Sequence, residues 1–248
     1  MTSNSHGESL GGSLSRAKKP DGSERLSELR RVWHDYGLSI VLVVLFLFAM
    51  AGQTLTGWHV YNAEQRDHGE RDISLTRYLA TGHFGEATFE NWESEFLQMA
   101  FYVILTVFLY QRGSSESKRP DVVELVDLDP RLSPNTDEAP WPVRRGGVVL
   151  KLYEHSLSLA FATLFVVSFT LHALTGLRDY NEELIAHTEP AVTLAGYMSS
   201  ARFWFESFQN WQSEFLALVA MVVLSIFLRQ RGSPESKPVD APTWDTGS

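Results

Sequence analysis

The sequence contains no cysteine in 248 residues, and its 21 lysines and arginines are outnumbered by 30 aspartates and glutamates. Without cysteine the chain can form no disulfide, no thiolate-ligated metal centre and no iron–sulfur cluster. With a formal charge of −9 it offers no basic surface that would neutralise phosphates. We therefore expect no nucleic-acid partner.

Catalytic signatures are missing as well. The sequence holds no His-Glu-x-x-His pair, no glycine-rich phosphate loop and no nucleophile–base arrangement. The segments between its apolar runs are too short for a separate catalytic domain. We therefore expect a protein that is not an enzyme, with no catalytic residues, no cofactor and no known metal-binding motif.

What the chain does have is four apolar runs, at residues 37–57, 96–110, 156–177 and 215–228. The first has 21 residues and no charge, and about 20 apolar residues in a helix cross a hydrocarbon layer of roughly 30 Å. The second and fourth runs reach that length only with the polar residues that precede them. The pattern predicts an all-α polytopic membrane protein with four transmembrane helices.

Basic residues are distributed unevenly around these runs. Of the 21, 16 precede the first run, lie between the second and third, or follow the fourth. Positive charge collects on the cytoplasmic side of a membrane. We therefore predict a multi-pass protein of the bacterial cytoplasmic (inner) membrane, with both termini cytoplasmic and the lipid bilayer as its partner.

A shift of 119 residues aligns the two halves of the chain without a gap, with 33 identities in 86 positions. This self-similarity predicts two tandem, parallel two-helix repeats related by a pseudo-two-fold axis along the membrane normal. The predicted domains are a disordered N-tail (1–32), repeat 1 (33–118, outer loop 58–91), a cytoplasmic linker (119–150), repeat 2 (151–237, outer loop 177–210) and a disordered C-tail (238–248).

Two motifs occur once in each repeat. The motif N-W-x-S-E-F-L stands at residues 91–97 and 210–216, and Q-R-G-S-x-E-S-K follows at 111–118 and 230–237. Together they resemble an uncharacterised family of bacterial, actinobacteria-type integral membrane proteins of unknown function. The resemblance covers both repeats and not the tails. It implies the fold and the location, and no activity.

The first candidate site is a polar ring in the membrane. The second glutamate of each N-W-x-S-E-F-L motif, Glu95 or Glu214, lies about one turn inside a predicted span. Because the two helices of a repeat run antiparallel, Gln53 can face Glu95 and His172 can face Glu214. Such a ring would handle protons, cations or a ligand. The alternative is a helix-entry motif, in which the glutamate favours the helix N-terminus or reaches back to water.

The second candidate site is a patch on the outer loops, where Y-N-x-E-x-x-x-H occurs twice. Its residues are Tyr61, Asn62, Glu64 and His68 in repeat 1, and Tyr180, Asn181, Glu183 and His187 in repeat 2. Each Glu–His pair shares a helix face, and two pairs that meet would offer carboxylates and imidazoles to a divalent metal. The alternative is a solvated face that orders the loops.

Three functions remain open from the sequence. The leading interpretation is a non-enzymatic structural, sensory or accessory membrane component, with a homo-oligomer or a membrane complex as its assembly. The first alternative is a small oligomeric proton or cation transporter or channel that uses Glu95 and Glu214. The second alternative is a metal-binding membrane protein that uses Glu64/His68 and Glu183/His187.

Overall fold

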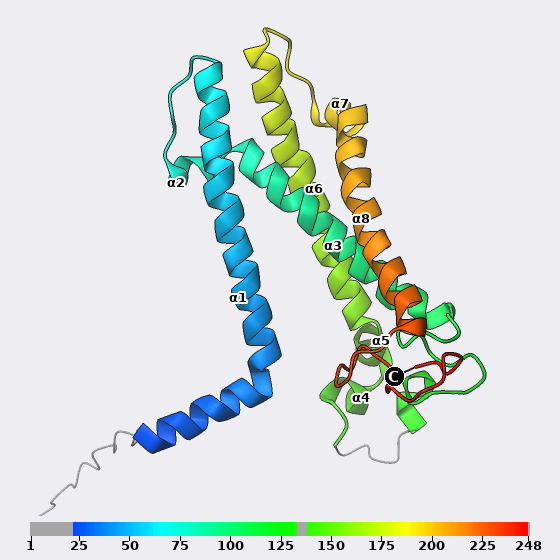
Figure 1. Cartoon of the computed structure of the whole chain (residues 1–248). Helices are drawn as coiled ribbons and strands as arrows, with labels where there is room; N and C mark the ends of the chain where they lie inside the picture. The colour runs from blue at the N-terminus through cyan, green and yellow to red at the C-terminus, as the bar shows by residue number, and fades with distance from the viewer. Residues whose placement is uncertain (1–21, 133–137, 248) are drawn as a thin grey trace, which may run out of the picture. The chain divides into compact units, whose positions relative to one another are not determined.

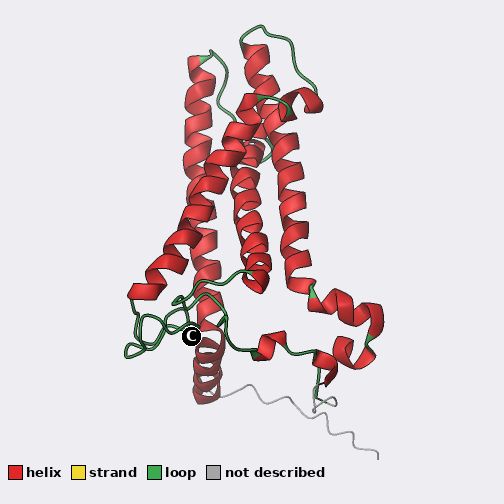
Figure 2. Ribbon diagram, turned by 90° about the vertical axis from the view of Figure 1, so that its right-hand side faces the viewer, coloured by secondary structure: helices red, strands yellow, loops and turns green. Residues whose placement is uncertain are grey.

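The computed structural model describes residues 22–132 and 138–247, and every regular element in these ranges is a helix (Figure 2). Four helices are long: α1 (Gly22–Asp67), α3 (Gly82–Phe108), α6 (Ser156–Ala186) and α8 (Ala201–Phe227). The short elements are α2 (Leu75–Tyr78), η1 (Leu125–Asp127), η2 (Pro130–Leu132), α4 (Trp141–Arg145), α5 (Gly147–Glu154) and α7 (Leu194–Met198). Residues 1–21 of the predicted N-tail, 133–137 of the linker and Ser248 lie outside the described residues.

The chain divides into two compact units, Met1–Thr56 and Gly57–Ser248. The described part of the first unit is the N-terminal portion of α1. This helix begins at Gly22, so residues 22–32 of the predicted disordered tail are helical. The second unit holds all the other elements. Its two ends are defined by their segments: the loop end carries residues 68–74 and 187–193, and the tail end carries 109–132, 138–155 and 228–247 (Figure 1).

In the part of the chain that the structure describes, three helices are long and apolar enough to cross a membrane: Leu26–Asp67, Ser156–Ala186 and Ala201–Phe227. Most of their large apolar side chains are exposed, as in helices whose outer faces contact lipid. The predicted span at 96–110 belongs to α3 up to Phe108 and extends two residues past its end, and α3 is not among the three. The polar side chains of Glu93, Glu95 and Gln98 interrupt the stretch of α3 that would otherwise be long enough.

Helix α3 lies along α6 and also contacts α8 (Figure 1). Glycine makes the close approach of α3 and α6 feasible. A Cβ added at Gly82 would come within 2.5 Å of the Asp179 amide nitrogen, and one at Gly85 within 2.5 Å of the Thr175 side chain. Small residues allow membrane helices to pack at such short distances. The buried residues of α6 are likewise small or polar: Ser168, His172, Ala173 and Gly176. They form one stripe along that helix.

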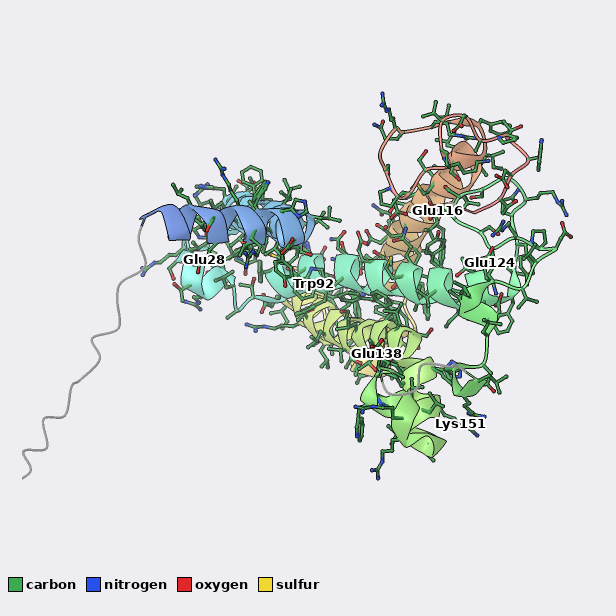
Figure 3. The ribbon with its side chains drawn as sticks, turned by 90° about the horizontal axis from the view of Figure 1, so that it is seen from below. Glu28, Trp92, Glu116, Glu124, Glu138 and Lys151 are labelled. Atoms are coloured by element: carbon green, nitrogen blue, oxygen red, sulfur yellow. The ribbon has the colours of Figure 1, made fainter. Side chains whose placement is uncertain are left out.

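The tail end is ordered by hydrogen bonds between distant segments. We expected residues 238–248 to be disordered, whereas residues 238–247 form turns against the segment that follows α3. Lys237 is 1% exposed, and its ammonium group donates to the backbone oxygens of residues 113, 242, 243 and 245. The Tyr102 hydroxyl donates to Glu116 at 2.5 Å, and Figure 3, seen from below, shows Glu116 and Glu124 at this end.

Candidate functional site

The centre of the second unit contains a buried histidine–carboxylate pair. His172 on α6 and Glu93 on α3 are both fully buried. The His172 Nδ1 atom lies 2.8 Å from Glu93 Oε2. The other carboxylate oxygen of Glu93 accepts a hydrogen bond of 2.9 Å from the indole Nε1 of Trp211 on α8. Both oxygens of this buried carboxylate therefore have a donor, and three helices meet through them.

The second ring nitrogen of His172 is different. Its Nε2 atom is buried and has no hydrogen-bond partner. Glu206 on α8 approaches it, with its Oε2 3.7 Å away. When Nδ1 donates to Glu93, the neutral imidazole carries its lone pair on Nε2. One face of the ring stacks on Phe203, with 5.0 Å between the centroids.

Two further carboxylates approach this nitrogen. Donor atoms of Glu86, His172 and Glu206 all lie within 4.8 Å of one another. The Tyr197 hydroxyl lies 3.2 Å from Glu86 Oε1 and 3.0 Å from Glu206 Oε2. It has one proton and can donate to only one of them at a time. Arg202 donates from Nε to Glu206 Oε1 at 2.9 Å, so Glu206 is held on both oxygens.

Burial changes the proton affinity of the groups outside the candidate spans. It raises the pKa of Glu86, which precedes the apolar part of α3, to about 9, and the nearby charge of Asp179 raises it further. Burial, followed by the charges of Glu86 and Glu206, also raises the pKa of the Tyr197 phenol on α7. Both groups are therefore uncharged at neutral pH, even with the Arg202 guanidinium nearby.

A pocket of about 670 Å³ connects this network with the loop end. Its wall holds seven carboxylates, three histidines and a single arginine, Arg202. The carboxylates are Glu64, Glu86, Glu90, Asp179, Glu182, Glu183 and Glu206. Negative charge on the walls of a concave site concentrates cations from solution.

For the predicted polar ring, the structure bears on the three residues of the second unit, Glu95, His172 and Glu214. The polar partners of His172 are Glu93 and Glu206 rather than Glu214. Glu95 is exposed and Glu214 is partly exposed. Their two helices do cross here, since the Gln98 side chain donates to the Glu214 backbone oxygen at 2.8 Å. Gln53 belongs to the first unit.

The predicted outer-loop patch separates into two groups with different roles. Tyr61, Glu64, His68, Glu183 and His187 line the pocket, and the two histidine rings lie 6.1 Å apart. Tyr180 lies beneath the Arg202 guanidinium at 5.1 Å.

The asparagines of the patch order the loops instead. Asn62 exchanges two hydrogen bonds with the backbone of Ile73, and Asn181 does the same with Val192. These pairs fix the position at which each loop returns toward the next helix.

The sequence reasoning missed Glu86, Glu93, Tyr197, Arg202, Glu206 and Trp211 as site residues. Most of the predicted site residues are identical in the two halves, whereas Glu86, Glu93, Arg202 and Glu206 are not. A usable signal was present in the motif itself, which reads NWESEFL once and NWQSEFL once. The first glutamate of NWESEFL, Glu93, is the buried one.

The fold and the site define an all-helical membrane protein with a histidine–carboxylate network inside its helix bundle. More specifically, the chain belongs to the family described as a domain of unknown function (DUF6766), whose match covers residues 29–248. No curated protein and no solved structure matches the chain.

Proposed function

We propose that this protein is a non-enzymatic integral membrane protein that binds cations through its loop-end pocket, in a sensory or accessory role. The observation that carries the proposal is the buried network of ionisable side chains at the base of an acidic pocket. Ionisable groups inside a membrane bundle are costly, and they are retained where they bind or move something. Apart from Glu86, six carboxyl groups facing one guanidinium leave negative charge for a cation to balance.

The proposal includes four spans in two tandem repeats, with both termini on the cytoplasmic side of a bacterial inner membrane. Helices α3 and α8 both have 27 residues, and their first residues, Gly82 and Ala201, are 119 positions apart. Their N-caps match too, since Thr81 and Ser200 each accept from the backbone nitrogen three residues on. The satisfied carboxylate of Glu93 also lowers the cost of placing α3 in a membrane.

A cation titration tests the proposed function. The full chain, purified in lipid nanodiscs, would be titrated with Mg²⁺, Ca²⁺ and Mn²⁺ while its thermal unfolding is followed. A ligand that binds only the folded state raises the unfolding temperature. We expect Glu64→Gln combined with Glu182→Gln to weaken binding about threefold to tenfold, since each substitution removes one negative charge from the pocket wall.

The control for this titration is Asp240→Asn, which removes one exposed carboxylate from the tail end. It should leave cation binding unchanged. Absence of any cation-dependent stabilisation at millimolar concentration would contradict the proposal. Flux measured in proteoliposomes, with Glu95→Gln and Glu214→Gln, distinguishes an accessory role from the transporter alternative, in which oligomers would form the pathway.

A further inference from the structure

We propose that Glu86, His172 and Glu206 bind one divalent transition-metal ion of the zinc type at the base of the loop-end pocket. This inference rests on the proposed function, because the pocket is the route by which the ion would arrive. It goes further by naming the ligand atoms, the class of metal and the number of ions per chain.

The donor geometry fits a single ion. Zinc bonds of about 2.1 Å in a tetrahedron place neighbouring donors roughly 3.4 Å apart. His172 Nε2 and Glu206 Oε2 are 3.7 Å apart, and Glu86 completes a set that lies within 4.8 Å. The side chain of Glu86 is flexible, and a movement of about an ångström toward the other two donors would bring its carboxylate to bonding distance. Glu86 and Glu206 line the pocket, so a water molecule from the pocket could supply a fourth ligand.

An independent observation points to a ligand here: the buried Nε2 atom of His172 has no partner. A protonated imidazole would point its Nε2–H at the Glu206 oxygen, which lies 3.7 Å from Nε2 and so beyond hydrogen-bonding distance in this arrangement. A neutral imidazole with its lone pair on Nε2 is what a metal ion requires. The unpartnered nitrogen is therefore explained better by a metal than by a proton.

The surroundings of His172 match those of metal-binding histidines. Such a histidine donates its other ring N–H to a carboxylate, which fixes the tautomer and the ring orientation. Here the partner is Glu93, and Trp211 holds Glu93 in turn. Arg202 and Tyr197 hold the oxygens of Glu206. Glu93 and Trp211 are thus positioning residues that touch no metal themselves.

The donor set limits the kind of metal. It contains one imidazole nitrogen, carboxylate oxygens and no sulfur, which suits Zn²⁺, Mn²⁺, Fe²⁺ or Co²⁺. Mg²⁺ and Ca²⁺ prefer oxygen ligands alone.

The number of ions per chain follows from a comparison of the two repeats, which align at a shift of 119 residues. The positions that correspond to His172, Glu206, Glu86 and Glu93 are Gln53, Ala87, Phe205 and Gln212. These residues cannot form the same site, so we expect one ion per chain.

The experiment uses the full chain in nanodiscs, titrated with Zn²⁺ and with Co²⁺ in the presence of excess Mg²⁺. Bound metal is counted by elemental analysis, and Co²⁺ absorption reports its ligands. We expect one ion per chain, at least a hundredfold weaker binding in His172→Gln, and tenfold to a hundredfold weaker binding in Glu93→Gln. Each substitution inserts the residue that stands at the corresponding position, Gln53 or Gln212.

Two matched variants serve as controls. His155→Gln changes an exposed histidine at the tail end, and Glu95→Gln changes the exposed glutamate beside Glu93. Both should bind Co²⁺ as the unaltered chain does. X-ray absorption of the unaltered Co²⁺ protein, with one imidazole among oxygen donors, tests the ligand set even if a variant does not fold.

Three results would overturn the inference. One is a folded chain that takes up no stoichiometric Zn²⁺ or Co²⁺. Another is equal affinity in the unaltered chain and His172→Gln. The third is a loss caused by His187→Gln and not by His172→Gln, which would place the ion at the pocket mouth. If Mg²⁺ or Ca²⁺ still stabilises the chain under any of these outcomes, the proposed cation-binding function survives. If no cation does, both fail.

Discussion

At the scale of single residues, the two glutamates of NWESEFL occupy different environments. Glu93 is fully buried, whereas Glu95 is exposed. Residues two positions apart on an α-helix point about 200° apart, so only one of them can face the bundle interior. Glu93 lies on the face of α3 that contacts α6 and α8. The buried network depends on this choice, because Glu93 is the partner of both His172 and Trp211.

A glycine on α6 gives a prediction at the same scale. A Cβ at Gly176 would overlap the Tyr197 hydroxyl and come within 3.0 Å of Glu86 Oε1. We expect Gly176→Ala to lower the free energy of unfolding by about 1–3 kcal/mol, because the phenol has to move. It should also weaken Zn²⁺ binding, since Tyr197 would no longer hold Glu86 and Glu206.

The matched control is Gly57→Ala, whose new Cβ would overlap the Tyr78 hydroxyl in the same way. Tyr78 bonds to His83 rather than to a carboxylate of the site. Denaturation of the two variants should therefore give similar losses of stability, while Zn²⁺ affinity falls only in Gly176→Ala. Equal affinities in the two variants would show that Tyr197 does not position the carboxylates.

The repeat in the sequence predicts some residues of the site and not others. The repeated motifs located the loop-ordering asparagines and five of the residues that line the pocket. They did not locate Glu93 or Glu206, because identity between the two halves marks positions that serve folding in both. A residue that serves one asymmetric site is identified only when the interhelical contacts are known.

At the scale of elements, the long helices could be predicted from apolar runs, but their ends could not. Helix α3 begins at Gly82, whereas the apolar run within it begins at residue 96. The turns of α3 that precede this run are polar. Their burial depends on contacts with α6, which the spacing of apolar residues in the sequence does not reveal. The C-terminal segment was misjudged for a similar reason. Its composition is that of a disordered tail, yet Lys237 attaches it to the rest of the tail end.

The prediction for this segment concerns Lys237, which attaches it to the rest of the tail end. Substitution by Met removes the donor for four backbone oxygens, and we expect local unfolding of residues 238–247 to become easier by about 2–4 kcal/mol. Limited proteolysis should then cleave this segment much faster. The control is Lys118→Met at the corresponding position, where the lysine forms a single ion pair of 2.6 Å with Asp127. Its loss should change proteolysis of the tail little.

At the scale of the whole molecule, the number of spans determines which surfaces share one side of the membrane. Three helices qualify by length and composition, and α3 falls short because of its polar residues. Two of those residues are paired inside the second unit, Glu93 with His172 and Trp211, and Gln98 with the backbone of α8. A hydropathy measure counts them as exposed to lipid, although their polar atoms are satisfied by protein.

Cysteine labelling determines the number of spans, because the chain has no cysteine of its own. Single substitutions at Glu70, Val123 and Glu189 place thiols at exposed positions in the two loops and the linker. If α3 crosses the membrane, the thiols at 70 and 189 react with an impermeant maleimide from one side and the thiol at 123 from the other. If α3 does not cross, 70 and 123 share a side and 189 is opposite. We expect the first pattern, since only four spans place both loops, and therefore all parts of the pocket, on the same side of the membrane.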